Sequence, residues 1–371
     1  MIKLLTYPEI DPQQWNELIQ SSPTATWFQT KEAYEFYAAN PDEMTPFAIG
    51  VEEKECKVES LKFKGEENSE AETTASTPYT LHPTPALKGV VVGYITCERN
   101  SLMQYFTRRA IIYGSPLLAN DISDEALSAL LTSLTKLPSL QGGGGGRLKP
   151  IYIETRNFND YSQWKDIFEI NGFAYQSHLN YHVDTTTIDL AQSNIGKHRW
   201  KYIRLSLRDG AKIVEHPTIE QVRAFYSILK DLYQTKVKTP IWSWEFFEQL
   251  YHIEHARYIL VELDGKVVGG TACVCLPGKA VYEWYACGLD NCRDDIRPLS
   301  VAIWGEMQYA AENGYPLFDF MGAGKPDEPY GVRDFKAEFG GELVEHGRFL
   351  CVRKPLLYWI GKMGVKWLKR R

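Results

Sequence analysis

The stretch PLFDFMGAGKPDEPYGVRDFKAEFGG, residues 316–341, decides the fold that we expect for this chain. Its large apolar residues follow a Gly-Tyr-Pro break and predict a short buried strand over 317–320, with Asp319 inside it. A loop rich in Gly and Pro follows over 322–331. Such loops bring backbone N–H groups close to a ligand because no Cβ intervenes. A simple turn would not need this combination, so we expect a ligand site here.

A single cation follows this loop. Lys336 lies between Phe335 and Phe339, just before a strand-like run over 343–352. Held between two rings, its ammonium group could present a point charge to a carboxylate, a phosphate or the end of a charged nucleotide. From the pattern alone, the simpler interpretation is an exposed Lys beside two core aromatic residues.

A strand with Asp, a Gly, a variable loop and then Phe-Lys-x-x-Phe-Gly-Gly resembles the C-terminal signature of the Fem family. These aminoacyltransferases build peptidoglycan cross-bridges on paired acetyltransferase-like (GNAT) domains. The matching residues here are Asp319, Gly322, Phe335, Lys336, Phe339, Gly340 and Gly341. Weaker similarity covers roughly residues 180–350 and fades towards the N-terminus. The resemblance implies that Lys336 contacts the acyl donor. It favours this role over that of an exposed Lys beside two core aromatic residues.

The length and composition fit a soluble protein of two domains. A chain of 371 residues exceeds the usual size of one compact core. The net charge of −6 argues against a nucleic-acid binder as a whole but leaves room for a local basic patch. The seven cysteines have no framework spacing, which favours a reduced, cytoplasmic setting. No apolar leader or membrane span is evident.

Helix and strand patterns occur in a similar order in both halves of the chain. With the resemblance, they predict an α/β (α+β) protein of two tandem GNAT-like domains, each a mixed, mainly antiparallel sheet flanked by helices. We expect an N-terminal domain over 1–178, a C-terminal domain over 179–350 and a basic amphipathic helix over 351–371. A polar loop is expected over 64–85 and a flexible glycine tether over 142–146.

Asp319 is the second candidate catalytic residue. Acyl transfer to an amine requires the attacking nitrogen to lose a proton, and Asp319 could accept that proton or orient the amine. A hydrogen-bonded Asp at the end of a strand explains it equally well. Phe335, Gly322, Tyr285 and Trp284 are candidate substrate-binding residues, although core packing explains the last two at least as well.

The run KHRWKYIRLSLRDGAK, residues 197–212, holds six cations and one His in sixteen residues. Such a helix suits phosphates, either of tRNA or of a nucleotide-linked or lipid-linked sugar. A solvated helix face is the alternative. Because the Fem family carries a basic helix near this place, the resemblance supports a phosphate-binding role for Arg204 and Lys201.

The residues before one predicted helix bear on which acyl donor the protein uses. In ordinary GNAT enzymes a Gly-rich loop before a helix holds the pyrophosphate of acetyl-CoA. The corresponding residues here, 291–300, contain no glycine, which disfavours CoA. We therefore expect no bound cofactor, with aminoacyl-tRNA or acyl-CoA as co-substrate. No Cys or Ser stands in a nucleophile context, so direct attack by the amine is predicted.

Three functions remain open. The first is transfer of an aminoacyl group from aminoacyl-tRNA to an amine of a peptidoglycan precursor. The second is an acyl-CoA-dependent N-acyltransferase of cell-envelope or polysaccharide metabolism. The third is a non-catalytic GNAT-like binding protein.

The cysteine spacing and the C-terminal helix bear on the metals, partners and location that we expect. No metal site is expected, because Cys273-x-Cys275 has no partner pair. No obligate protein partner is inferred. The basic amphipathic helix at residues 354–371 predicts attachment to anionic lipid at the inner face of the membrane. Packing of its apolar face against the first domain is equally compatible with the sequence.

Overall fold

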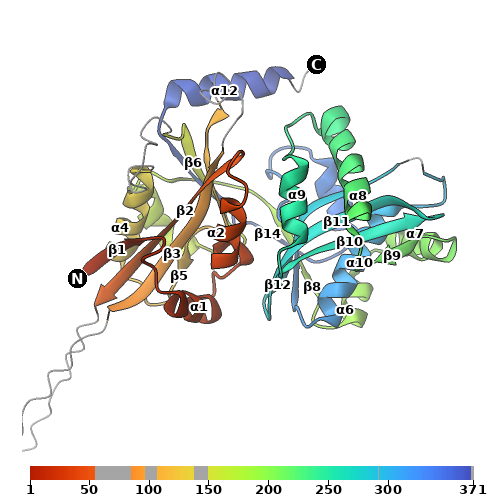
Figure 1. Ribbon diagram of the computed structural model, residues 1–371, viewed down its shortest axis with the longest axis horizontal. Coiled ribbons are helices and arrows are strands. Elements are labelled where there is room, and N and C mark those ends of the chain that lie inside the picture. Colours follow the sequence, from red (N-terminus) through yellow and green to blue (C-terminus); the bar gives the residue numbers. More distant parts are fainter. Residues whose placement is uncertain (55–84, 97–106, 138–148, 291, 369–371) are drawn as a thin grey trace, which may run out of the picture.

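The computed structural model describes residues 1–54, 85–96, 107–137, 149–290 and 292–368. Two β-sheets lie side by side, each with helices on both faces (Figure 1). The glycine tether and the expected polar loop fall outside the described residues, apart from Pro85, at which a strand begins.

The first sheet has the strand order β1-β2-β3-β4-β6-β15-β7, with β5 paired to β3. Its only parallel pair among the described strands is β4 with β6. The strands are Ile2–Thr6 (β1), Met44–Lys54 (β2), Pro85–Thr96 (β3), Ala110–Tyr113 (β4), Leu117–Leu118 (β5), Tyr152–Arg156 (β6), Ala174–Gln176 (β7) and Arg348–Val352 (β15).

The second sheet has the order β14-β8-β13-β12-β11-β10-β9. Here too one pair of the described strands is parallel, β12 with β13. The strands are Asn180–Asp184 (β8), Lys212–Val214 (β9), Ala256–Leu263 (β10), Lys266–Leu276 (β11), Ala280–Gly288 (β12), Leu317–Asp319 (β13) and Glu342–Val344 (β14).

The helices form where the sequence supplies caps and apolar stripes. Helix α1, for example, begins at Pro12, and the Asp11 side chain accepts a hydrogen bond from the backbone N–H of Gln14. The α-helices are Pro12–Ser21 (α1), Lys31–Ala38 (α2), Asp124–Thr135 (α4), Lys165–Ile170 (α5), Ile188–Asn194 (α6), Lys197–Arg208 (α7), Ile219–Leu232 (α8), Trp244–Tyr251 (α9), Pro298–Glu312 (α10), Gly331–Ala337 (α11) and Pro355–Leu368 (α12). Short 3₁₀ turns cover Trp27–Gln29 and Ser162–Trp164, and a π-helical turn covers Tyr233–Val237.

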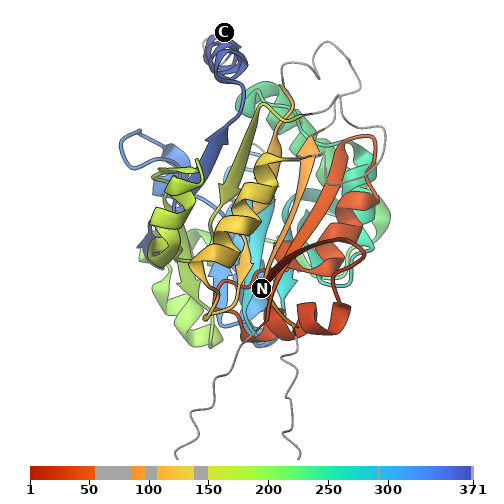
Figure 2. The same cartoon turned by 90° about the vertical axis from the view of Figure 1, so that its left-hand side faces the viewer.

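The apolar core is shared between the two halves of the chain. Helices α4 and α5 cover the outer face of the first sheet, the face that is nearer the viewer in Figure 2. Helix α10 covers the outer face of the second sheet. Between the sheets, Trp15 and Phe36 from α1 and α2 belong to one buried cluster with Phe225 and Phe246 from α8 and α9. Burial of this cluster stabilises the contact between the halves.

The same order of elements occurs twice. Two helices, three antiparallel strands, a helix and a parallel strand run from α1 to β6, and again from α8 to β13. This confirms the predicted fold class of two tandem GNAT-like units, each with a mixed, mainly antiparallel sheet.

The two sheets exchange strands. Strand β8, which follows β7 of the first sheet, inserts between β13 and β14 of the second. Strand β15, which follows β14 of the second sheet, inserts between β6 and β7 of the first. Each sheet is therefore completed by a strand whose neighbour in the chain belongs to the other sheet.

Two expectations need correction at the C-terminal end. The run 343–352 is not one strand: it divides into β14 and β15, which belong to different sheets because a turn with Gly347 at φ +67° redirects the chain. Residues 348–350, expected in the second domain, therefore pair with the first sheet. In addition, the residues around Lys336 form helix α11, which the sequence pattern did not indicate.

Candidate functional site

A narrow polar cleft lies where the two sheets exchange strands. Its lining comes from the ends of β6 and β13 and from the turns into β8 and β15, and includes Arg156, Asn157, His178, Asn180, Gly322 and Arg348. The volume is about 10 Å³, room for about one water molecule. A larger ligand would therefore bind at the mouth of the cleft.

Asp319 ends strand β13 beside this cleft and is fully buried, at 0 % exposure. Its carboxylate is hydrogen-bonded to the side-chain amide of Asn180 (2.7 Å), to Nε2 of His182 (3.1 Å) and to the backbone N–H of Met321 (2.5 Å). Strand β8 supplies the first two partners because His182 lies opposite Asp319 in the antiparallel register. The geometry fits the hydrogen-bonded interpretation of Asp319, because its carboxylate has three internal partners.

The two histidines beside Asp319 have opposite pKa shifts. Burial alone would lower the pKa of His182, but the carboxylate of Asp319 outweighs it and the pKa is raised. The ring of His346 lies 5.2 Å from that of His182. Burial lowers the pKa of His346, and the nearby charge of His182 acts in the same direction. A proton near the cleft is therefore held on His182 rather than on His346.

The turn after β13 has an unusual backbone. Met321 has φ +56° and Gly322 has φ +139°, a conformation that side chains with a Cβ rarely adopt. The N–H of Gly322 donates to Oδ1 of Asn180 at 2.7 Å. A Cβ at Gly322 would also lie 3.3 Å from Nε2 of His178. Glycine at this position therefore lets the turn close against the other side of the cleft.

Lys336 lies beneath this turn and not in bulk solvent. Its side chain is 12 % exposed, and Nζ donates to the backbone carbonyls of Phe320 (2.7 Å) and Gly322 (3.0 Å). The same ammonium group lies 3.5 Å from Oε1 of Glu283 on β12. The two carbonyl contacts hold the residues that follow β13 in place, so Lys336 fixes the wall of the cleft.

Glu283 is a site residue that the sequence did not indicate. It is buried beside Lys336, and burial raises its pKa to about 7, although the Lys336 ammonium acts in the opposite direction. Burial and the nearby charge of Glu283 also raise the pKa of Glu306 on α10. Two buried carboxyl groups therefore lie close together, and each disfavours the charged form of the other.

The aromatic pair expected to hold Lys336 holds a different cation. The guanidinium of Arg199 lies 4.5 Å from the ring centre of Phe335 and 5.7 Å from that of Phe339. Lys336 lies over the ring of Phe320 instead, at 5.1 Å. The sequence placed the cation correctly near aromatic rings but could not show that α11 turns its Nζ towards β13.

Arginines from the first sheet form the other wall. Oε1 of Glu154 accepts from Nε of Arg156 (2.7 Å) and Nη1 of Arg348 (3.1 Å). Burial alone would raise the pKa of Glu154, but the two guanidinium groups lower it to about 2. Nη2 of Arg348 lies 2.9 Å from Nε2 of His178, whose pKa is lowered to about 3 by burial and by the two arginines. His178 is therefore neutral and accepts this hydrogen bond.

Trp284 and Tyr285 lie on β12, in the shared core between the halves. The Trp284 ring contacts those of Phe28 and Phe36, at centroid distances of 5.1 and 6.0 Å. The Tyr285 ring contacts that of Phe247 at 5.1 Å. Core packing, the alternative interpretation of this pair, accounts for these contacts.

Lys201 and Arg204 lie elsewhere. Both are exposed on α7, which Figure 1 shows on the side of the second half that faces away from the first. The structure does not bring them to the cleft.

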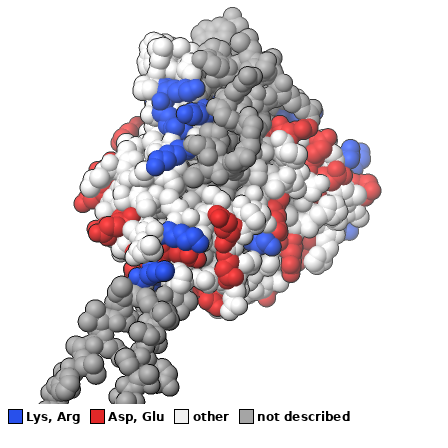
Figure 3. Space-filling view, turned by 60° about the vertical axis from the view of Figure 1, so that its left-hand side comes forward, with Lys and Arg blue, Asp and Glu red and all other residues white. Residues whose placement is uncertain are grey.

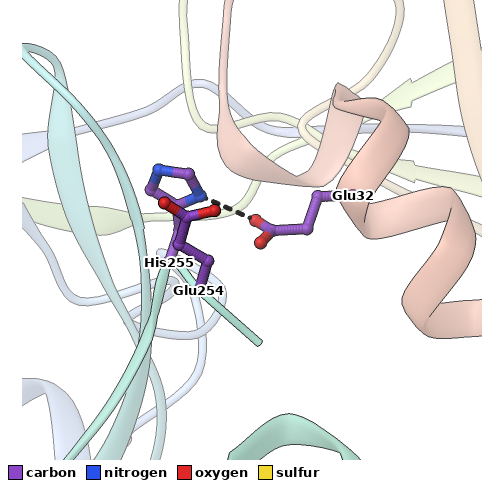
Figure 4. A group of neighbouring side chains, drawn as sticks. All are labelled: Glu32, Glu254 and His255. Carbon is purple, nitrogen blue, oxygen red and sulfur yellow. Dashed lines mark hydrogen bonds and ion pairs between the residues drawn. The ribbon is translucent and has the colours of Figure 1, made fainter. Parts of the chain in front are cut away.

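A group with metal-ligand chemistry connects the halves at another point. Glu32 on α2 lies near Glu254 and His255, which precede β10, and their ligand atoms are within 4.8 Å of one another (Figure 4). Nδ1 of His255 lies 3.0 Å from Oε2 of Glu32. This hydrogen bond accounts for their proximity, so we assign no metal to them.

Four residues of the cleft could not be assigned from their sequence contexts: Arg156, His178, Asn180 and Arg348. None lies in a motif. Arg156 has one partner nearby in the chain, Glu154, but the partners of His178, Asn180 and Arg348 are far away along the chain. Only the pairing of β8 with β13 and of β15 with β6 brings them together.

Comparison with known proteins gives the class. Residues 197–336 match the family model of the acetyltransferase (GNAT) domain. No curated protein sequence matches the chain. With the duplicated fold, the match defines the protein as a tandem GNAT-fold enzyme of the acyltransferase class.

Solved structures narrow the fold further. FemX superimposes with a TM-score of 0.65 at 14 % identity, over 96 % of this chain and 99 % of that chain. A tandem GNAT protein from the clavulanic acid biosynthesis pathway gives 0.52 at 9 % identity, over 94 % and 98 %. The C-terminal domain of a putative lysylphosphatidylglycerol synthetase from Agrobacterium fabrum gives 0.51 at 12 % identity, over 75 % and 85 %. The expected resemblance to Fem-type proteins is thereby confirmed at the level of the fold.

Proposed function

We propose that this protein transfers an aminoacyl group from aminoacyl-tRNA to an amine of a peptidoglycan precursor. The amine nitrogen bonds to the carbonyl carbon of the aminoacyl ester, and the ester C–O bond to the tRNA ribose breaks. The proton lost by the amine is balanced by the one that the leaving ribose hydroxyl gains.

One observation carries the proposal: the segment 316–341, on which the Fem resemblance rests, forms one wall of a polar cleft between the halves. Asp319 and Lys336 fasten the turn at Gly322 from two sides. The opposite wall consists of Arg156 and Arg348. The two walls come from different sheets.

The cysteines support direct attack without a covalent enzyme intermediate. Cys273 and Cys287 are buried, and burial raises the pKa of both thiols. Thiols of this kind are poor nucleophiles because the thiolate is the reactive form. Neither thiol is suited to form a covalent intermediate, which supports direct attack by the amine of the acceptor.

The test is a transfer assay with the purified full chain, aminoacyl-tRNA and a nucleotide-linked muropeptide, read by mass spectrometry of the product. We expect Lys336→Ala to lower kcat/KM at least tenfold, because the turn after β13 loses its fastening. Lys325→Ala is the matched control, since Lys325 is an exposed Lys on the same loop, paired with Glu328. We expect it to leave the rate unchanged.

Two outcomes would contradict the proposal. If acyl-CoA replaces aminoacyl-tRNA as donor, the protein is the acyl-CoA-dependent N-acyltransferase. If neither donor supports turnover or binding, the fold serves a non-catalytic binding function. Mass spectrometry of cell-wall peptides from a deletion strain gives an independent measurement of the acceptor.

We further propose that α12 attaches the protein to a surface of anionic lipid. Leu356, Trp359, Ile360 and Met363 are 70, 60, 41 and 52 % exposed, and their spacing puts them on one face of the helix. The opposite side contacts the first sheet through the ring of Tyr358. The apolar face is therefore free of the protein among the described residues.

Charge selects the lipid. Lys362 is exposed on α12, and the sequence continues with Lys366, Lys369, Arg370 and Arg371. Figure 3 shows Lys and Arg side chains gathered toward the end of the molecule that carries α12. Apolar side chains, Trp and basic residues together suit the interface of an anionic bilayer. Among the described residues, no helix is long and apolar enough to cross a membrane.

A further inference from the structure

We propose that Arg156 and Arg348 bind a phosphate-type oxyanion at the mouth of the cleft. The inference deepens the proposed function, because it names an anionic group that a substrate would carry, and its biological meaning rests on that function. The binding itself is measurable without any turnover.

The charges of this wall do not balance. Arg156 and Arg348 both pair with a single carboxylate, Glu154, on the same oxygen, Oε1. Their other hydrogen-bond partners are the hydroxyl of Tyr113 and His178, which accepts from Arg348 and is neutral. The wall therefore carries one more positive than negative charge in a partly buried place, where an unpaired charge is costly.

Each of the two arginines also has a nitrogen that could donate a hydrogen bond to a ligand. Among the described residues, Nη2 of Arg156 and Nε of Arg348 have no hydrogen-bond partner, whereas the other nitrogens bond Glu154, Tyr113 and His178. The side chains are 24 and 26 % exposed, so both are partly open to solvent where they line the cleft. Arginine forks match the oxygens of phosphate in pairs.

The two guanidinium groups also disfavour each other's positive charge. Burial lowers the pKa of Arg348 to about 10, and the charge of Arg156 acts in the same direction. A second anion would relieve this repulsion. A phosphate group carries about 1.5 to 2 negative charges at pH 7, more than a carboxylate can supply.

The experiment is isothermal titration of the full chain with inorganic phosphate and inorganic pyrophosphate, with acetate as the carboxylate arm and a nucleoside diphosphate as the nucleotide arm. We expect pyrophosphate to bind more tightly than acetate. Arg156→Gln and Arg348→Gln should each weaken binding at least tenfold. Arg293→Gln is the matched control, because Arg293 is an exposed arginine paired with Asp295.

Glu154→Gln keeps the test decisive if an arginine variant fails to fold. This change removes the competing carboxylate, so we expect pyrophosphate to bind several-fold more tightly. Unchanged affinity in Glu154→Gln, or an equal loss in Arg293→Gln and Arg348→Gln, would overturn the proposal. Binding of pyrophosphate without transfer activity would leave the anion site in place and contradict the proposed function alone.

Discussion

At the scale of single residues, the charges in the cleft are set by their neighbours rather than by residue type. Asp319 is buried with three internal partners, and Lys336 donates to backbone carbonyls. His178 and His182 are two residues of one type with pKa values shifted in opposite directions. Burial and the charge of Arg348 oppose protonation of His178, whereas the carboxylate of Asp319 favours protonation of His182.

Replacing Asp319 tests this arrangement. In Asp319→Asn we expect the pKa of His182 to fall, because the charge that holds its proton is gone. The raised pKa stabilises the folded state fully below the ordinary value of about 6.5, and this contribution is lost as the pH rises through the raised value. The variant should therefore lose on the order of 1–3 kcal/mol at pH 6 and less at pH 8.5.

The measurements are an NMR titration of the histidine rings and denaturant unfolding at the two pH values. Asp327→Asn is the control, since Asp327 is exposed on the loop that follows the same strand. A His182 pKa that does not change in Asp319→Asn would contradict the assignment.

At the scale of elements, β15 and α12 are neighbours in the chain with different roles. Strand β15 lies inside the first sheet and pairs on both sides, with β6 and β7. Helix α12 contacts the sheet through Tyr358 and exposes its apolar residues. We therefore expect β15 to be essential for folding and α12 to be dispensable for it.

Two truncations separate these roles. A chain that ends at residue 354 loses α12, and we expect it to fold but to lose binding to vesicles that contain phosphatidylglycerol. A chain that ends at residue 346 also loses β15, which leaves the hydrogen bonds of β6 and β7 unpaired, and we expect it not to fold. Circular dichroism and vesicle flotation measure the two effects.

Vesicles of phosphatidylcholine alone are the control for charge, and gel filtration distinguishes lipid binding from self-association. Equal flotation of the full chain and the chain ending at 354 would contradict the role of α12. A folded chain ending at 346 would contradict that of β15.

At the scale of the whole molecule, strand β15 couples the two halves. The first sheet is not complete without this strand, which follows β14 of the second sheet, and the core around Phe36 and Phe246 is common to both halves. We therefore expect a single cooperative unfolding transition, although chains of this size often unfold domain by domain.

Phe168→Ala tests this coupling, because Phe168 is fully buried in the outer core of the first sheet and stacks on Phe349 of β15. Loss of the ring should cost about 3–5 kcal/mol. Calorimetry should show one transition at a lower Tm. The spectroscopic signals of the Trp and Tyr residues in both halves should change together over the same temperature range. Two separated transitions would show that the halves unfold independently.

Most elements could be predicted from the sequence. The strands around Ile49 and Ile259, the helix with its apolar stripe through Leu127 and Leu130, and the turn at Asp264 all follow from local periodicity, caps and turn residues. These signals depend on neighbours within a few positions. The partners of β8 and β15 in the two sheets could not be predicted, because strand pairing is non-local.

The class of fold and the importance of the segment 316–341 could be inferred from the sequence, because periodicity, glycine and a family-like motif are properties of consecutive residues. The contacts of that segment depend on the folded structure. The register between β8 and β13 buries Asp319, and the insertion of β15 beside β6 brings Arg348 to Arg156 and Glu154. Contacts between residues far apart in a chain depend on how strands pair, and local sequence does not specify that pairing.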